Sequence, residues 1–205
     1  MRTNHFFAIL MILSLPLFTM AQSNSINGVN VDQLVQTVQA VQGDADIAKF
    51  KFRSTTKWIS GGHSETKIQS FYGAKQEDQS RTEPLVLVGD EPAILLGKNK
   101  GPNAVEAVLH ALSSCLSVGI VYNAAAQGIT IDSLEFDVEG DLDLHRFLGL
   151  SETQRPGYEN IVVTVKAITS ASDEEFDQLL AYVKKTSPVL DIISNPVPVT
   201  IETSK

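Results

Sequence analysis

Residues 104–127 form the longest stretch of the chain that combines helical spacing with almost no charge. Large apolar side chains recur through it at intervals of three and four, and most other positions hold Ala, Ser, Gly or Cys. A helix that is apolar or small nearly all round must be buried against other elements. Gly101, Pro102 and Asn103 mark its start, and Gly128 has the position of a C-terminal cap. The stretch therefore predicts a long central helix.

Shorter patterns surround this helix and set the fold class. Apolar residues alternate with polar ones over 49–58, a turn with two glycines follows, and Ser172 with Glu175 forms a capping box before another helical pattern. Strands and helices segregate without regular alternation, so the order predicts an α+β fold, with an antiparallel sheet packed around the central helix. The expected helices are 31–42, 104–127 and one after Ser172, and the expected strands are 49–58, 66–72, 134–138, 161–165 and an edge strand at 197–201, where Pro198 lies.

The first residues predict export. A weakly basic start is followed by an apolar run over 6–20, and small residues occupy two of the positions that a signal peptidase reads, which predicts cleavage after Ala21. The run is short and contains Pro16, which argues against a membrane span, although an uncleaved anchor is the alternative. We expect a signal peptide at 1–21, an N-terminal segment with a short helix at 22–46, and one domain at 47–205. The mature protein is then periplasmic or secreted, with no membrane association after cleavage.

Charge and histidine spacing exclude several classes of function. Removing Arg2 with the leader changes the formal charge of −8 to −9, and an acidic surface argues against nucleic-acid binding. No glycine-rich phosphate loop is present, and the four histidines are scattered. We therefore expect neither a cofactor nor a metal ion.

Cys115 is the only cysteine and lies in the middle of the predicted central helix. It cannot form an internal disulfide, so it is buried and inert, paired between two chains, or a reactive thiol. A reactive thiol needs a cation, a helix N-terminus or a hydrogen-bond donor nearby, together with access to solvent. The neighbouring residues supply no permanent cation, which leaves these alternatives open.

Several separate segments resemble the OsmC/Ohr (osmotically inducible protein C and organic hydroperoxide resistance) family, in a branch with a single cysteine. The resemblance covers roughly residues 47–203 and implies an OsmC-like α+β fold. It also implies an intertwined homodimer with two active sites at the subunit interface. The matching segments are 101–116, 141–144, 147–150, 155–158 and 186–197.

The resemblance also implies a chemistry. In the best-known branches a cysteine thiolate reduces an organic hydroperoxide and becomes a sulfenic acid, which a second cysteine then attacks. Cys115 matches the first cysteine, while Ser187 occupies the position of the second and cannot form a disulfide. The family also uses an arginine, for which Arg53 and Arg81 are candidates.

The family's glutamate is matched less directly. Glu106 lies one residue nearer to the cysteine than usual, and Val105 holds the usual place. On one unbroken helix Glu106 lies about 180° from Cys115 and His110 about 140°. Glu106 therefore reaches this cysteine only if the helix begins after it; otherwise it faces the partner's site. We predict catalytic roles for Cys115 and Glu106, and a structural or interface role for His110.

Three hypotheses follow. The leading one is a thiol protein that reduces organic hydroperoxides through Cys115, with an external thiol as reductant. The second is a homodimeric binding module that holds an apolar small molecule at the dimer interface, with Cys115 lining its pocket. The third is a redox-sensitive dimer linked by a disulfide between the two Cys115 residues. This hypothesis is the least favoured, because a cysteine in the middle of an apolar helix face is hard to bring to another.

Overall fold

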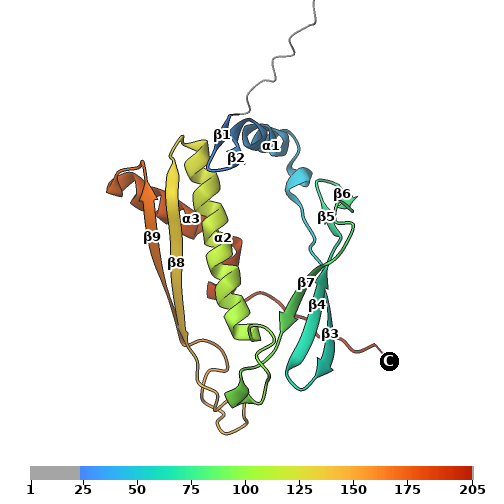
Figure 1. Cartoon of the computed structure of the whole chain (residues 1–205). Coiled ribbons are helices and arrows are strands. Elements are labelled where there is room, and N and C mark those ends of the chain that lie inside the picture. The colour runs from blue at the N-terminus through green and yellow to red at the C-terminus, as the bar shows by residue number, and fades with distance from the viewer. Residues whose placement is uncertain (1–23, 205) are drawn as a thin grey trace, which may run out of the picture.

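The computed structural model describes residues 24–204 and has an α+β architecture (Figure 1). The expected signal peptide at 1–21 lies outside the described residues. All strand pairs within 24–204 are antiparallel and form small separate sheets beside one long helix. The predicted fold class is therefore confirmed.

The long helix α2 spans Ala104–Ala126, close to the predicted 104–127. Asn103 caps its start, and Gly128 follows its end at a φ of 75°, a left-handed conformation that glycine adopts without strain. By length and apolar composition α2 would qualify as a membrane span, as core helices of globular proteins also do. Leu112, Leu116 and Ile120 form its buried face, whereas other apolar residues of the helix remain exposed within this single chain.

The buried face of α2 packs in a core with a two-stranded ribbon and a second helix. The ribbon consists of β8 (Ile131–Asp141) and β9 (Asn160–Thr169), and the helix is α3 (Asp173–Thr186), which begins with the predicted capping box. Alternate residues of both strands point inward, which is the period of two that a half-buried ribbon requires. The inward-facing apolar residues of the ribbon are Ile131, Leu134, Phe136, Ile161, Val163 and Val165.

A short second helix follows directly after the end of α3. α3 ends at Thr186, and α4 (Pro188–Ser194) starts directly after Ser187. Proline suits the first position of a helix because its missing N–H would have no intrahelical partner there. Val189, Leu190 and Ile193 of α4 pack against the core that α2 and α3 share.

A second sheet lies on the other side of α2, with strand order β3-β4-β7. The predicted strand at 49–58 is present only in part: β3 begins at Thr55, and before it only Lys51 pairs, in an isolated antiparallel bridge with Tyr72. Phe50 and Phe52 instead stack near Phe71, with ring centroids 6.2 and 5.5 Å from it. The strands of this region are β3 (Thr55–Ser60), β4 (His63–Ile68), β5 (Phe71–Gly73), β6 (Gln76–Asp78) and β7 (Leu85–Gly89).

The connection from β7 to α2 is organised by a buried carboxylate. It contains a 3-10 turn, η2 (Ala93–Leu95), and the carboxylate of Asp90 accepts hydrogen bonds from three backbone N–H groups, at Glu91, Lys98 and Lys100. Burial pushes the pKa of Asp90 upward, but these three hydrogen bonds outweigh it, so the pKa lies below its ordinary value. The bonds fix the path of the chain into the start of α2.

The first described residues form a short hairpin ahead of the predicted N-terminal helix. β1 (Ser25–Ile26) and β2 (Val29–Asn30) are joined by Asn27 and Gly28, both with positive φ, as in the tight turns that Asn-Gly favours. The Asn27 carboxamide donates to Ile129 O and accepts from Ile131 N, each at 2.9 Å. It thereby fastens the hairpin to the turn between α2 and β8.

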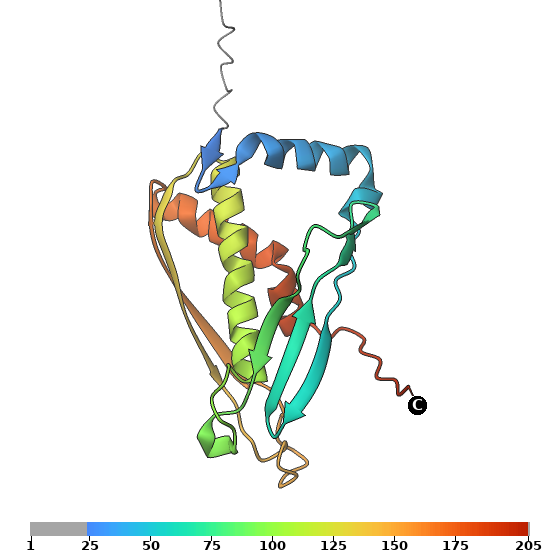
Figure 2. The ribbon, with the colours of Figure 1, turned by 45° about the vertical axis from the view of Figure 1, so that its right-hand side comes forward.

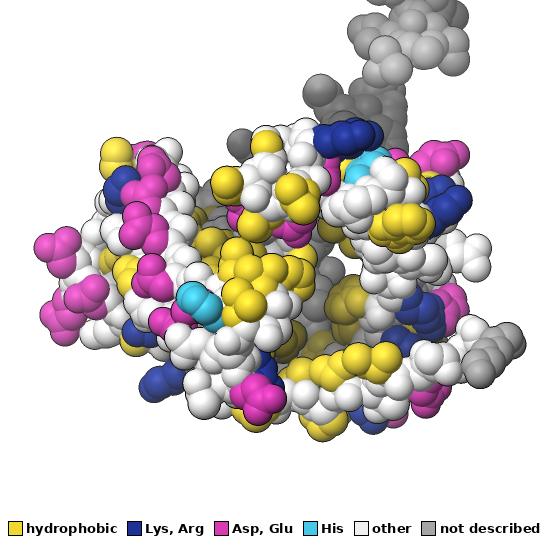
Figure 3. Space-filling model, turned by 90° about the horizontal axis from the view of Figure 1, so that it is seen from below, with side chains coloured by type: hydrophobic (Ala, Val, Ile, Leu, Met, Phe, Trp, Pro, Cys, Tyr) yellow, Lys and Arg dark blue, Asp and Glu magenta, His cyan; other side chains and the backbone are white. Residues whose placement is uncertain are grey.

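Helix α1 (Val31–Gly43), predicted at 31–42, runs from this hairpin toward the second sheet and is followed by the turn η1 (Ala45–Ala48) (Figure 2). Apart from this connection, the half of the molecule that contains α2, β8, β9, α3 and α4 makes few contacts with the half that contains the second sheet. Trp58 and Leu87 of the second sheet keep exposed fractions of 69% and 57%. Figure 3, seen from the end that carries η2, shows hydrophobic side chains along the inner edges of the hollow between the halves.

The predicted edge strand at 197–201 is not present among the described residues, and this expectation is corrected. The segment after α4 is extended but has no strand partner, and Ile201 is 91% exposed. A strand exists only where a neighbour satisfies its backbone, and no strand of residues 24–204 pairs with this segment.

Candidate active site

Cys115 lies half-buried on α2 and faces a groove of about 550 Å³. Positions 111, 115 and 118 follow one another at helical spacing, so one strip of α2 forms the first wall of the groove. The end of α3 and the start of α4 form the other wall. The thiol is thus neither sealed in the core nor fully exposed.

Ser187 is the nearest polar neighbour of the thiol. Its Oγ lies 3.2 Å from Cys115 Sγ, within hydrogen-bonding distance for sulfur, although 72 positions separate the two residues in the chain. Ser187 is 5% exposed. The position that the resemblance assigns to a second cysteine is therefore brought into contact with Cys115, and a hydroxyl stands there.

The junction of α3 and α4 fixes Ser187. Its backbone N–H donates to Val183 O at 2.9 Å, its carbonyl accepts from Asp191 N at 3.0 Å, and its Oγ accepts from Leu190 N at 3.3 Å. Serine is a preferred N-cap, since its short side chain reaches the first free amides of a helix. The same residue therefore begins α4 and contacts the thiol.

His110 also lines the groove, together with Ser114. The angle of about 140° between His110 and Cys115 argued against a shared face. The groove nevertheless includes both His110 and Cys115. Ser114 lies four positions after His110 and directly before Cys115, so it connects the two residues along the lining. The structural or interface role predicted for His110 stays a prediction, and the structure adds that this residue lines the groove.

Glu106 lies elsewhere, at the start of α2. Its carboxylate accepts from Asn103 N at 2.8 Å, while Asn103 Oδ1 accepts from Glu106 N at 2.9 Å, so the pair forms a capping box. Because α2 begins at Ala104, Glu106 and Cys115 share one unbroken helix and point to opposite sides. Within one chain the structure does not bring the two predicted catalytic residues together.

The two candidate arginines are also used elsewhere. Arg53 forms a two-pronged ion pair with Glu77, at 2.8 and 2.9 Å. This pairing raises the pKa of Arg53 and lowers that of Glu77, chiefly through the hydrogen bonds between them. Arg81 lies over the Phe71 ring, 5.4 Å from its centroid. Neither arginine lines the groove of the same chain.

The groove is therefore electrically neutral apart from the thiol and the imidazole. Among residues 24–204, no Lys, Arg, Asp or Glu belongs to its lining. Its apolar lining residues include Ala111, Val118, Val183, Pro188 and Val189. Such a lining suits an uncharged, partly apolar molecule and offers no charged group that would bind an anion.

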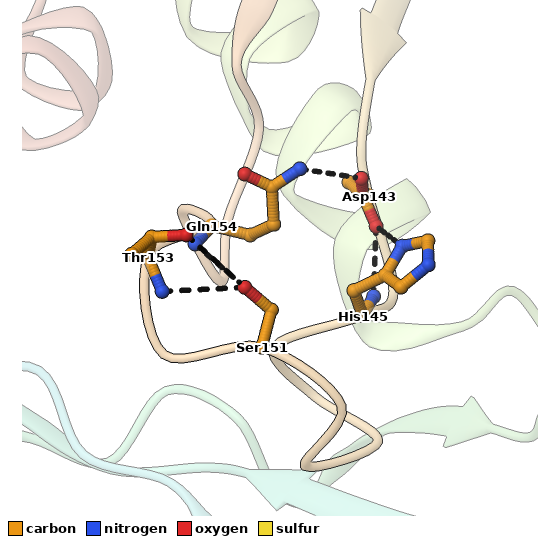
Figure 4. A network of polar contacts seen from close by, with 5 residues as sticks. All are labelled: Asp143, His145, Ser151, Thr153 and Gln154. Carbon is orange, nitrogen blue, oxygen red and sulfur yellow. Dashed lines mark hydrogen bonds and ion pairs between the residues drawn. The ribbon is translucent and has the colours of Figure 1, made fainter.

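A second polar cluster lies in the segment between β8 and β9 and holds that segment together (Figure 4). The Asp143 carboxylate accepts from His145 N at 2.8 Å and from Gln154 Nε2 at 3.1 Å, and His145 Nδ1 lies 2.6 Å from it. Ser151 Oγ accepts from the N–H groups of Thr153 and Gln154. The bonds from His145, its backbone N–H first, lower the pKa of Asp143. The contacts are local, and the cluster does not reach the Cys115 groove.

Comparisons with known proteins agree with this arrangement. Residues 97–202, which include α2, Cys115 and Ser187, match the model of the family of OsmC-like proteins. A comparison with curated proteins gave no match.

Three solved structures show the same fold. An OsmC-like protein of Mycoplasma pneumoniae has a TM-score of 0.55 at 18% identity, covering 71% of this chain and 89% of that one. A Psychrobacter arcticus protein assigned to osmotic stress and detoxification responses has 0.52 at 15%, covering 70% and 88%. An OsmC-like protein of unknown function from Vibrio cholerae has 0.50 at 12%, covering 69% and 92%. At such identities the likeness establishes the fold, and the family match extends over more than half of the sequence. The chain therefore belongs to the family of OsmC-like proteins.

Proposed function

We propose that this protein is a one-cysteine thiol peroxidase that reduces organic hydroperoxides through Cys115. The observation that carries the proposal is the position of Cys115 Sγ, at the wall of an open, neutral groove and 3.2 Å from the Ser187 hydroxyl. A thiol in such a place has access to a small molecule and a hydrogen-bond donor beside it. The uncharged lining favours an organic hydroperoxide over a charged substrate.

The proposed first step transfers one oxygen atom. The Cys115 thiolate attacks the distal oxygen of the hydroperoxide, an S–O bond forms and the O–O bond breaks. The leaving alkoxide takes a proton from solvent and departs as the alcohol. Cys115 becomes a sulfenic acid, so sulfur is oxidised by two electrons and the peroxide is reduced.

The return step needs an external thiol, because Ser187 cannot form a disulfide. A small thiol attacks the sulfenic sulfur, water leaves, and a mixed disulfide forms on Cys115. A second molecule of that thiol then releases Cys115 and leaves as its own disulfide. This route consumes two small thiols for each hydroperoxide and balances in atoms and electrons.

We also propose that the protein acts as a homodimer, exported after loss of residues 1–21. Support comes from the large apolar side chains that one chain leaves uncovered on the second sheet, among them Trp58, Leu85 and Leu87. A monomer seldom exposes apolar surface on this scale, and a second copy would cover it. In such a dimer Glu106, which points away from Cys115 of its own chain, is proposed to serve the thiol of the partner.

The test uses purified mature protein, cumene hydroperoxide and dimedone, a probe specific for sulfenic acids. We expect dimedone to label Cys115 after peroxide addition and a small thiol to sustain peroxide consumption, with Cys115→Ser inactive in both assays. Absence of both labelling and thiol-dependent peroxide loss in the wild-type protein would end the proposal.

The apolar lining of the groove favours one alternative, a binding module for an apolar small molecule. In that case an uncharged, apolar fluorescent dye would bind equally well to the wild type and to Cys115→Ser. Binding to neither protein would exclude the alternative for this class of ligand.

A further inference from the structure

The Ser187 hydroxyl has one proton, which it can donate in a hydrogen bond to Cys115 Sγ. Its oxygen accepts the Leu190 N–H, and an amide can only donate, so this contact uses a lone pair of Oγ and leaves the proton free. The remaining partner within reach is Cys115 Sγ. When the sulfur is a thiolate it can only accept, and the direction of the hydrogen bond is then fixed from Ser187 to Cys115.

Ser187 is also held in place before any reaction begins. Its backbone bonds to Val183 and Asp191 tie it to the last turn of α3 and the first turn of α4. The side chain is almost fully buried, so solvent competes little for its proton. A donor that is already oriented stabilises a charge without having to reorganise when that charge forms.

No cation shares this task within the described chain. The groove lining of residues 24–204 contains no lysine or arginine, and both candidate arginines contact groups outside it. Hydrogen bonds to a charged acceptor are markedly stronger than those to a neutral one. Among residues 24–204, the Ser187 hydroxyl is therefore the best-placed group for favouring the thiolate over the thiol.

We propose that Ser187 is a positioning residue that stabilises the Cys115 thiolate and holds its sulfur at the wall of the groove. The thiol proton leaves to solvent, and Ser187 keeps its own. On this proposal, serine at position 187 has a function of its own, in addition to replacing the second cysteine of the family. The inference rests on the proposed function in taking Cys115 as the reacting thiol, but its test involves no peroxide.

The experiment measures the rate of alkylation of Cys115 by iodoacetamide at pH 7 and pH 10. We expect Ser187→Ala to lower the rate at pH 7 about tenfold, the size of one charge-assisted hydrogen bond. At pH 10, where cysteine is ionised without help, the rates should agree within about a factor of two. Ser187→Thr, which keeps a hydroxyl, should restore most of the rate at pH 7.

The matched control is Ser172→Ala, because Ser172 caps α3 as Ser187 caps α4 but does not contact the thiol. It should leave alkylation unchanged at both pH values. Ser187→Gly serves if the alanine variant folds poorly, since glycine is a better N-cap than alanine and also lacks the hydroxyl. Equal rates at pH 7 for the wild type and the folded variants without a hydroxyl would overturn the inference.

The two proposals fail in different ways. If alkylation behaves as expected but the wild type consumes no peroxide, the peroxidase proposal fails and the role of Ser187 stands. If peroxide is consumed while Ser187→Ala alkylates like the wild type at pH 7, the role of Ser187 fails alone.

Discussion

Gly119 of α2 lies directly against Val183 of α3, so close that a Cβ at position 119 would come within 2.8 Å of Val183 Cγ1. The two helices can approach this closely only because position 119 has no side chain. The same contact forms part of the groove that Cys115 faces.

We expect Gly119→Ala to destabilise the protein. Overpacking costs about 1–3 kcal/mol, and the better helix propensity of alanine returns up to ~1 kcal/mol. Urea unfolding would measure the change. Gly43→Ala is the control, because a Cβ there meets nothing within 4 Å. Equal stability of Gly119→Ala and the wild type would mean that α3 moves away freely.

Ser187→Cys should create a protein that forms a disulfide within one chain. Oγ of Ser187 is already 3.2 Å from Cys115 Sγ, and a small rotation brings two sulfur atoms to the bond length of about 2.0 Å. After one equivalent of peroxide, thiol titration should find no free thiol in the variant. Mass spectrometry would identify the linked peptides. Two persistent thiols, or a disulfide between chains, would contradict the geometry described here.

Glu106→Gln separates the two roles assigned to position 106. The glutamine oxygen can still accept from Asn103 N, so we expect the melting temperature to stay the same. If the carboxylate serves the partner's thiol as proposed, kcat/KM for cumene hydroperoxide should fall by roughly 10²-fold. An unchanged kcat/KM would confine Glu106 to capping α2.

The Asp143 cluster should depend on pH. The pKa of Asp143 is lowered in the folded protein, so its contribution to stability is complete above the unfolded value of about 3.9 and is lost as the pH falls through the folded value. Limited proteolysis should therefore cut the segment 142–155 faster in acid than near neutrality. Asp143→Asn should remove most of this difference, and if it does not, other groups control the segment.

Much of the fold was predictable because strong local signals and tertiary packing agree. The spacing and small residues of 104–127 predicted α2, and Ser172 with Glu175 predicted the start of α3. The Asn-Gly hairpin at 27–28 was missed although its dipeptide is a strong signal. The start of α4 is hard to predict because proline usually ends a helical pattern, although after a serine cap it can also begin a new helix.

The remaining differences depend on contacts that a local pattern does not contain. Phe50 and Phe52 fit a strand by alternation, yet they stack with an aromatic ring some 20 positions away. The site shows the same limit. Cys115 and Ser187 were singled out through the resemblance, but nothing near either residue predicts a contact across 72 positions. The place of His110 at the groove also follows from the width of the groove rather than from its angle on the helix.

The carboxamide of Asn27 has a consequence for the order in which the molecule assembles. It bonds to residues 102 and 104 positions further along the chain, Ile129 and Ile131. The hairpin that carries Asn27 is synthesised early, but its hydrogen-bond partners exist only after the end of α2 and the start of β8 have been synthesised. Contacts between such distant positions close late because a long loop must first be brought together. We therefore expect the beginning of the described chain to be among the last parts to fold, and to join the hairpin to an α2–β8 turn that is already formed.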